Sequence, residues 1–245
     1  MIFAAIADVH GNAAALDAVL ADIRRLGITE VVNLGDCLSG PLEAAKTADR
    51  LMALDIPTVR GNHDRYLVEV PPVAMGASDA HAYAQLSPHH VEWLAGLPFS
   101  LTYRDEVFLC HATPGQDDLY FLEEVCAEGH VRLRDAAGIE ALAAGIAEPL
   151  ILCAHSHVPR LVALADGRQV VNPGSVGCPA YQDDTPVHHK VGAGHCLASY
   201  AVLEKTTEGW APQFRSVRYD NMSMARMAAA NGRPDWANAL SRGRV

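Results

Sequence analysis

Side chains that can bind metals follow five short apolar runs of this sequence, each at the point where the run ends. Short apolar runs bounded by polar residues are typical of buried strands. In open α/β sheets ligands bind at the carboxyl ends of the strands, so these side chains are candidates for one shared site. The candidates are Asp8, His10, Asp36, Asn62, His63, Asp64, His111, His155 and His157.

The spacing of these residues favours a metal site. Residues two apart in an extended segment point the same way, so the D-x-H pair at residues 8–10 and the H-x-H pair at residues 155–157 can each face one site. The two pairs alone suit a mononuclear site, whereas adding Asp36, Asn62 and His111 suits two ions that share a bridging carboxylate. Oxygen and nitrogen donors without a thiolate favour Mn, Fe, Zn or Ni over Ca or a structural zinc site.

The elements that must position these residues begin as alternating strands and helices. The runs IFAAIA, EVVNLGD and IPTVRGN predict three strands. Apolar residues at helical spacing over residues 16–23, and the segment from Pro41, predict the two helices between them. This βαβαβ order is typical of a parallel sheet.

The rest of the chain is richer in predicted strands. SLTYR and VFLCH predict a hairpin that turns at Asp105-Glu106, and LVALADGRQVVN predicts another. PLILCAHSH, LASYAVLE and PQFRSVRY predict further strands. Short helices are expected around residues 80–86 and 89–95, a helical stretch over roughly 131–147, and a helical packing face in the tail at 221–245. The fold class is therefore α/β with a β-rich second half.

Composition and charge narrow the function classes. The 245 residues, 50% of them hydrophobic, suffice for one large domain. No apolar run is long enough to span a membrane, and the N-terminus lacks the features of a signal peptide, so we expect a soluble cytoplasmic protein. The formal net charge of −10 argues against a surface that follows long nucleic acids, yet allows a small phosphorylated substrate.

Taken together, the motifs resemble those of the calcineurin-like metallophosphoesterase superfamily. DVHGN (8–12), GD (35–36), GNHD (61–64), a histidine after a strand (His111) and HSH (155–157) occur in the family's order. NPGSVG followed by ASYAVLE resembles the end of its small bacterial and archaeal phosphodiesterases. The resemblance implies a four-layer α/β/β/α sandwich of two mixed β-sheets flanked by helices.

The same resemblance implies roles for the candidate residues. One divalent metal ion would be bound by Asp8, His10 and His157, and the other by Asn62, His111 and His155, with Asp36 as the bridge. The nucleophile would be a water or hydroxide between the metals. His63 would assist the leaving group as a general acid, and Asp64 would orient its ring. The implied reaction is hydrolysis of a phosphate ester, with a small phosphodiester favoured as the substrate.

Three other functions compete with this interpretation. A repair-type nuclease conflicts with the acidic balance and the lack of a basic, aromatic-interleaved stretch. A Ser/Thr protein phosphatase would carry GNHE and an Asp-Arg-Gly stretch, whereas here His63 precedes Asp64 and CLSGP follows Asp36. A metal-bound interaction scaffold without activity would usually have lost a ligand. Substrate choice is expected to lie in a cap at 70–97 and a loop at 177–194, and homo-oligomer formation is left open.

Overall fold

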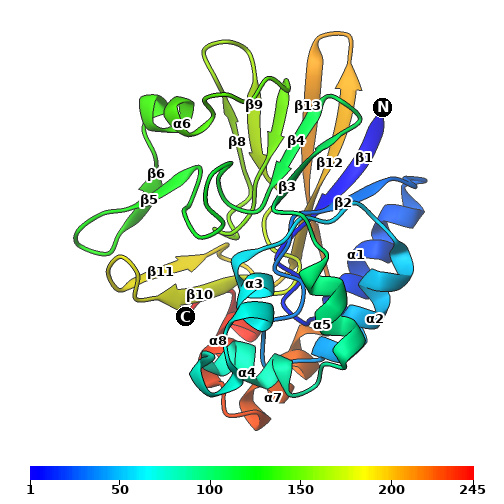
Figure 1. Cartoon of the computed structure of the whole chain (residues 1–245), viewed down its shortest axis with the longest axis vertical. Coiled ribbons are helices and arrows are strands. Elements are labelled where there is room, and N and C mark those ends of the chain that lie inside the picture. The colour runs from blue at the N-terminus through cyan, green and yellow to red at the C-terminus, as the bar shows by residue number, and fades with distance from the viewer.

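The first strand shows why the chain folds into layers. In β1 (Ile2–Ile6) the side chains of Phe3 and Ala5 are buried in a core between two β-sheets, whereas those of Ala4 and Ile6 are buried beneath helices. Successive side chains of a strand point to opposite faces, so an entirely apolar strand needs packing partners on both sides. The computed structural model, which describes residues 1–245, provides a second sheet on one side and helices on the other (Figure 1).

The first sheet contains β1, β2 (Val31–Asn33), β12 (Ala198–Thr206) and β13 (Gly209–Val217). Strand β2 runs parallel to β1, while β12 pairs antiparallel with β1 on its other side and β13 pairs antiparallel with β12. The outer face of this sheet is covered by α1 (Ala13–Arg25) and α2 (Ala44–Leu54). The apolar residues that predicted the first helix are buried in this core, which confirms the predicted helix face.

The second sheet contains β3 (Ser100–Tyr103), β4 (Val107–Cys110), β7 (Leu150–Leu152), β9 (Gln169–Asn172) and β8 (Arg160–Ala163), in this spatial order. Its three central strands are parallel to one another and its two edge strands are antiparallel, as hairpins require. Helix α6 (Ala136–Leu142) packs on the outer face through Ile139. The predicted four-layer sandwich of two mixed sheets is confirmed.

Two hairpins extend beyond the second sheet and lie side by side (Figure 1). One joins β5 (Glu123–Val125) and β6 (Val131–Leu133), and the other joins β10 (Ala180–Asp183) and β11 (His189–Gly192). The second hairpin occupies most of the segment predicted as the 177–194 loop.

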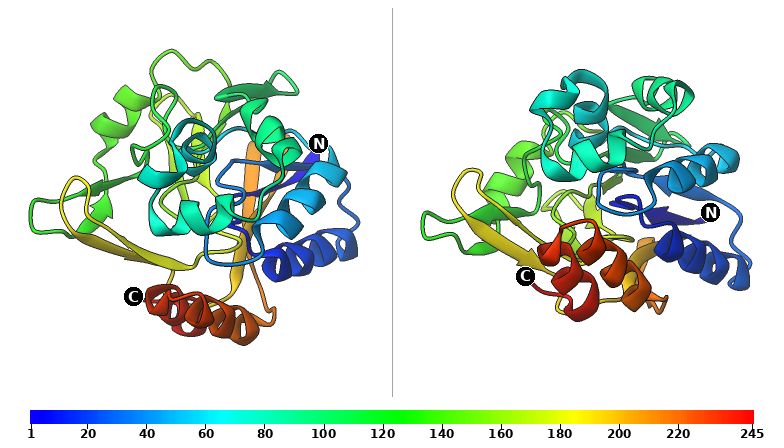
Figure 2. Two further views of the ribbon diagram at one scale, coloured as in Figure 1. Left: turned by 60° about the horizontal axis from the view of Figure 1, so that its bottom comes forward. Right: turned by 90° about the horizontal axis from the view of Figure 1, so that it is seen from below.

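Helices cover the end of the molecule that lies at the bottom of Figure 1. The 70–97 segment contributes η1 (Pro72–Ala74), α4 (Ala77–Tyr83) and α5 (Pro88–Ala95), after α3 (Asn62–Glu69). The C-terminal tail forms α7 (Asn221–Ala230) and α8 (Pro234–Arg242), which pack together and bring the C-terminus close to β10 (Figure 2). A small core that includes Leu42, Met224 and Trp236 attaches this pair of helices to the rest of the chain.

Two local predictions are wrong. The segment IPTVRGN makes a single bridge between Thr58 and Asn33 instead of a third strand. The helix expected over 131–147 begins only at Ala136, and residues 131–133 form β6 instead. The later start is set by Asp135, which caps α6 by accepting a hydrogen bond from the Gly138 N–H at 2.7 Å. Helix α3 begins at Asn62, so the motif GNHD lies at the start of a helix.

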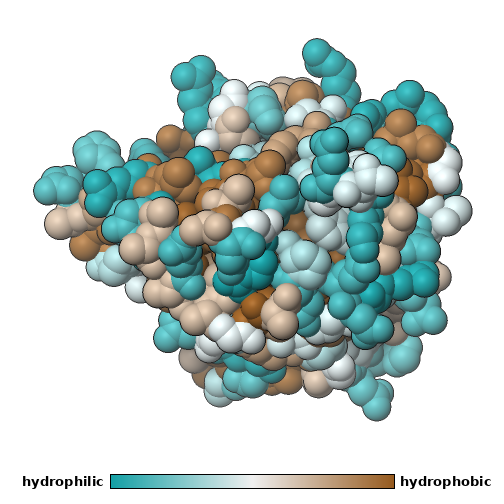
Figure 3. All heavy atoms as spheres, turned by 90° about the horizontal axis from the view of Figure 1, so that it is seen from above, coloured by the Kyte–Doolittle hydropathy of each residue, from teal (hydrophilic) through white to brown (hydrophobic).

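The face opposite the carboxyl ends of the parallel strands carries no part of the candidate site. It is the upper face in Figure 1, formed by strand ends and connecting turns, and its hydrophobic side chains lie in groups among hydrophilic ones (Figure 3). None of the helices combines the length and the apolar character that crossing a membrane requires.

Candidate metal centre

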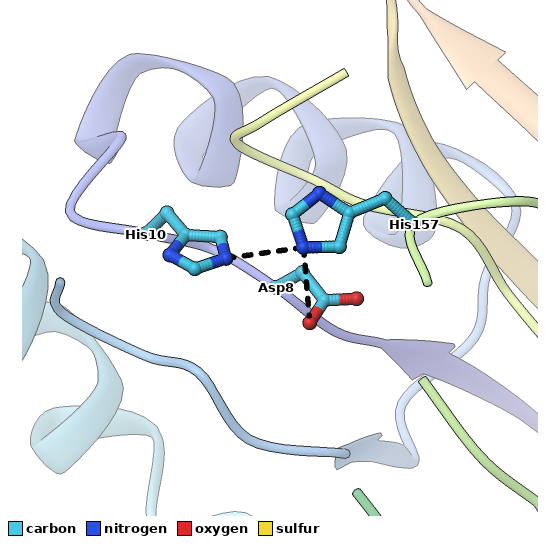
Figure 4. A group of neighbouring side chains, drawn as sticks. All are labelled: Asp8, His10 and His157. Carbon is cyan, nitrogen blue, oxygen red and sulfur yellow. Dashed lines mark hydrogen bonds and ion pairs between the residues drawn. The ribbon is translucent and has the colours of Figure 1, made fainter. Parts of the chain in front are cut away.

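The first group of candidate ligands comprises Asp8, His10 and His157, whose ligand atoms all lie within 4.8 Å of one another (Figure 4). Asp8 and His10 follow β1 and His157 follows β7, so the group spans both sheets. The Nε2 atom of His157 lies 3.2 Å from Nε2 of His10 and 3.6 Å from Oδ1 of Asp8. All three residues are buried.

The second group comprises Asp36, His111 and His155, again with ligand atoms within 4.8 Å of one another. Asn62 joins this group, since its Oδ1 lies 3.2 Å from Nε2 of His111. The Oδ2 atom of Asp36 lies 3.4 Å from Nε2 of His111 and 3.7 Å from Nε2 of His10. Asp36 therefore touches a histidine of each group, which is the position that a bridging carboxylate requires.

Backbone carbonyl groups set the tautomers of three candidate histidines. The Nδ1–H groups donate to backbone oxygens, from His10 to Ser39 at 2.9 Å, from His111 to Leu34 at 2.8 Å and from His157 to Cys178 at 2.6 Å. A neutral imidazole that donates from Nδ1 presents a lone pair at Nε2. In its neutral form each of the three rings thus offers an Nε2 lone pair to the centre, as ligating histidines do when a second partner orients them.

The chemistry of the first group fits a bound cation. Both carboxylate oxygens of Asp8 are buried without a hydrogen-bond partner, and burial raises the pKa of this group well above its usual value. A buried carboxylate without a partner costs several kcal/mol, on the order of a lost ion pair. The two Nε2 lone pairs of His10 and His157 also face each other at 3.2 Å and repel unless a cation lies between them. A divalent ion satisfies both demands at once.

The pKa shifts in the centre agree with this electrostatic pattern. Burial lowers the pKa of His10 to about 4 and that of His155 to about 3, so both rings are neutral and able to ligate near neutral pH. Burial would also lower the pKa of His111, but the adjacent Asp36 raises it to about 10. The carboxylate thus favours a positive charge beside it, whether a proton or a metal ion supplies that charge.

A comparison with known families identifies the chain. The family model of the calcineurin-like phosphoesterase superfamily domain matches residues 1–192. The chain belongs to this superfamily. Membership in it, together with the two metal-capable groups, supports a hydrolase of phosphate esters as the general reaction class.

Individual relatives align with almost the whole length of the chain. A metallophosphoesterase from Sphaerobacter thermophilus, known from its crystal structure, shares 24% sequence identity with this chain and superimposes on it with a TM-score of 0.76. The alignment covers 99% of this chain and 100% of the other. An uncharacterized protein of Methanocaldococcus jannaschii is 22% identical over 267 residues, 96% of this chain and 95% of that protein. The structural likeness establishes the shared fold, including the helices beyond residue 192.

The backbone of the candidate metal centre is unusual at its candidate ligands. Five of them have a positive φ, a region that non-glycine residues seldom occupy, although Asp, Asn and His tolerate it best. Such conformations persist where the surrounding structure imposes them, and they cluster at functional sites. The five are Asp8 at 51°, His10 at 49°, Asp36 at 54°, His155 at 67° and His157 at 60°.

The carboxylate of Asp36 is held from the side opposite the histidines. Its Oδ1 accepts a hydrogen bond from the backbone N–H of His63 at 3.0 Å, in the first turn of α3, which leaves Oδ2 for the centre. Burial alone would raise the pKa of Asp36, but His111 and His63 more than offset it and lower the pKa well below its usual value. The residue before α3 must be small, because a Cβ atom at Gly61 would lie 2.1 Å from Oδ1 of Asp36.

This close approach predicts the effect of a methyl group at Gly61. Gly61→Ala is expected to displace the Asp36 carboxylate, to lower the free energy of unfolding by about 1–3 kcal/mol and to weaken metal binding. Thermal unfolding and metal titration of the variant measure both effects. Gly115→Ala is the matched control, since a Cβ at Gly115 meets no atom within 4 Å. Equal behaviour of the two variants would contradict the tight packing of Gly61 on Asp36.

The predicted partner of the His63 ring is wrong. The carboxylate of Asp64 accepts hydrogen bonds from the backbone N–H groups of Asp36, Cys37 and Gly61 at 2.9–3.0 Å, so it holds the loop after β2 against α3. The ring of His63 instead donates from Nδ1 to Oδ1 of Asp79 at 2.8 Å. Asp64 lies in the first turn of α3, where its carboxylate accepts from the Gly61 N–H that precedes the helix, while the other two N–H groups belong to the loop after β2.

Asp79 is thus a functional candidate that sequence reasoning missed. It lies in α4, within the segment expected to form a cap, and it is 5% exposed. The sequence offered one weak signal, since Asp79 and Glu92 are the only acidic residues between positions 70 and 97. Within the loop expected to help choose the substrate, His189 is buried and hydrogen-bonded to the Tyr120 hydroxyl at 2.9 Å, whereas His188 is exposed beside Asp184.

Proposed function

We propose that this chain hydrolyses a small phosphodiester with two bound divalent metal ions, and that His63 protonates the leaving group. The position of Asp36 carries the proposal, because its Oδ2 approaches a histidine of each candidate metal group at 3.7 and 3.4 Å. The unpartnered carboxylate of the buried Asp8 supports it from the other side of the centre.

The donors suit two ions that share one carboxylate. Mn, Fe, Zn and Ni accept such mixed nitrogen and oxygen ligands. Two divalent ions bound there would supply Lewis-acid stabilisation of the phosphoryl charge and activation of an attacking water. One set of donors would be Asp8, His10 and His157, the other Asn62, His111 and His155, with Asp36 common to both.

The role of His63 follows from its position beside the two groups and from its partner Asp79. Burial alone would lower the pKa of His63, but Asp36 and Asp79 raise it to about 9 and so favour the protonated ring. Asp79 is not among the candidate ligands, so its contribution persists when cations engage Asp36. The hydrogen bond at Nδ1 leaves Nε2–H free to donate a proton to the departing alkoxide.

We further propose that residues 1–245 act as one domain in which the 70–97 segment and the 221–245 tail frame the substrate. A cavity of about 480 Å³ contains His10 and His63, and its walls include Ser78 from the cap and Trp236 from the tail. Ser78 Oγ accepts a hydrogen bond from Arg233 at 2.6 Å, which connects the two segments. Their contact supports a cap that depends on the C-terminal helices for its position.

Hydrolysis of two chromogenic esters tests this function. Protein stripped of metal with a chelator and resupplied with Mn, Fe, Zn, Ni or Mg should hydrolyse the diester bis(p-nitrophenyl) phosphate. If a diester is the true substrate, this rate should exceed the rate with the monoester p-nitrophenyl phosphate. Metal content per chain is measured on the same samples. If the protein binds two ions and hydrolyses neither ester, the result would contradict the proposed activity and favour a metal-bound interaction scaffold.

A further inference from the structure

Two tyrosines pack against the histidines that the H-x-H loop at residues 155–157 brings to the metal centre. The ring of Tyr120 lies 4.9 Å from the ring of His155, centroid to centroid, and the ring of Tyr181 lies 4.7 Å from that of His157. Both distances are typical of packed aromatic rings. Since His155 belongs to one candidate metal group and His157 to the other, each group contains one histidine that rests against a tyrosine.

The two tyrosines are joined through their hydroxyl groups. Their oxygen atoms lie 2.6 Å apart, so one hydroxyl donates a hydrogen bond to the other. The hydroxyl of Tyr120 also lies 2.9 Å from Nε2 of His189, whose Nδ1–H donates to the backbone oxygen of Val187 at 2.9 Å. In the neutral His189 ring Nε2 is an acceptor, so Tyr120 donates to it and accepts from Tyr181.

The H-x-H loop needs support because its backbone is in an unfavourable conformation. His155 and His157 have φ values of 67° and 60°, which persist only where the surrounding structure imposes them. Asn172 supports the loop backbone from the end of β9, since its Nδ2 donates to the backbone oxygen of Ala154 at 2.8 Å. The hydroxyl of Tyr181 lies 3.3 Å from the backbone oxygen of His155. The two tyrosines thus contact both the loop and its histidine rings.

The register of the β10–β11 hairpin explains how Tyr181 and His189 meet the same partner. His189 lies directly opposite Asp183 in the hairpin, and Tyr181 lies two residues before Asp183. Residues two apart in a strand share a face, as do residues directly opposite each other in an antiparallel pair. Tyr181 and His189 therefore lie on one face of the hairpin, and both contact Tyr120 there. This hairpin is thereby connected to both candidate metal groups.

We infer that the hydroxyl pair of Tyr120 and Tyr181, anchored by His189, holds His155 and His157 in the orientation that binds metal. Ligand rings that are already held in place lose less conformational entropy when a cation binds, so the pair should raise the affinity of the centre. Tyr120 and Tyr181 are positioning residues that act through the two histidines. The inference deepens the proposed function, because it rests on metal ions bound at the centre.

Tyr181→Phe tests the inference, because it removes the hydroxyl pair and keeps the ring that packs on His157. The variant should bind cobalt(II) about three- to tenfold more weakly than the wild-type protein, as the loss of one hydrogen bond allows. Titration of the chelator-stripped protein with cobalt(II) measures the affinity. The visible absorption of the bound cobalt reports its coordination geometry, and this spectrum should change as well. Tyr120→Phe should show both effects, since it breaks the same pair from the other side.

A double variant and a control show whether the hydroxyl pair itself matters. Each single substitution already breaks the pair, so Tyr120→Phe combined with Tyr181→Phe should bind cobalt about as weakly as Tyr120→Phe alone. Tyr200→Phe is the matched control, because its buried hydroxyl donates to Oδ2 of Asp22 at 2.7 Å, away from the centre. This control should lower the free energy of unfolding, yet keep the cobalt affinity and spectrum of the wild-type protein.

The outcomes separate this inference from the function on which it rests. Unchanged cobalt affinity and spectrum in Tyr181→Phe would overturn the inference and leave the metal centre intact. Additive losses in the double variant, or an equal loss in Tyr200→Phe, would also overturn it. A wild-type protein that binds no cobalt would contradict the proposed function itself. If the buried Tyr120→Phe fails to fold, Tyr181→Phe still decides the question, because Tyr181 is only partly buried.

Discussion

Replacing Asp36 by asparagine is expected to lower kcat by on the order of a thousandfold and to weaken the binding of both metal ions. The side chain keeps its shape in this variant and can still accept the hydrogen bond from the His63 N–H, which is 3.0 Å from Oδ1. The negative charge that faces His10 and His111 is lost, however, and this charge is what a shared ligand contributes to both groups. Turnover of bis(p-nitrophenyl) phosphate and the metal content per chain measure the two effects together.

Asp55→Asn is a suitable control for this experiment. Asp55 ends α2, is exposed and has a positive φ of 48°, a conformation that asparagine adopts equally well. The control should bind both metals and turn over normally. Loss of one metal ion with retention of the other in Asp36→Asn would show that Asp36 serves one group alone. Full metal content with normal turnover would remove it from the centre altogether.

The sequence predicted the candidate ligands because they follow strands. Asp8 and His10 come after β1, and His155 and His157 after β7, so the strands bring them to one edge of the sheets. The predicted alternation of an extended segment does not orient them, because all four residues have a positive φ. The β3–β4 and β8–β9 hairpins were also predictable from the local sequence, whereas the β5–β6 and β10–β11 hairpins were not, and the two-sheet sandwich was implied by the family resemblance.

Contacts between segments distant in the sequence were not predictable in this way. Asp79 reaches His63 because α4 packs over α3, and no local pattern specifies that packing. The adjacent Asp64 looked like the natural partner, but its carboxylate accepts from the N–H groups of Asp36 and Cys37 in the loop after β2, a contact between distant segments.

Removal of the His63 imidazole is expected to slow hydrolysis most for substrates with poor leaving groups. In His63→Ala, a diester that releases an alkoxide should lose about a hundredfold or more in kcat, whereas one that releases p-nitrophenolate should lose less than about tenfold. The difference arises because an alkoxide must be protonated as it departs, while p-nitrophenolate is stable without a proton. Rates for a series of diesters with leaving groups of graded pKa measure the change in slope. Metal content should stay unchanged, since His63 belongs to neither candidate group.

Asp79→Asn keeps the His63 ring and removes only the carboxylate that holds it. Asp79 raises the pKa of His63, so its loss should lower that pKa, and the protonated form should be lost at a lower pH than in the wild-type protein. For poor leaving groups, the pH at which kcat falls on the alkaline side should therefore move toward neutral. At low pH, where the ring is still protonated, kcat of the variant should fall less below the wild-type value. Asp49→Asn provides the matched control, because it removes a comparable hydrogen bond, 3.0 Å from His90 Nε2, away from the centre. Equal losses for good and poor leaving groups in His63→Ala would exclude His63 as the acid, and an unshifted pH profile in Asp79→Asn would exclude Asp79 as the residue that holds its proton.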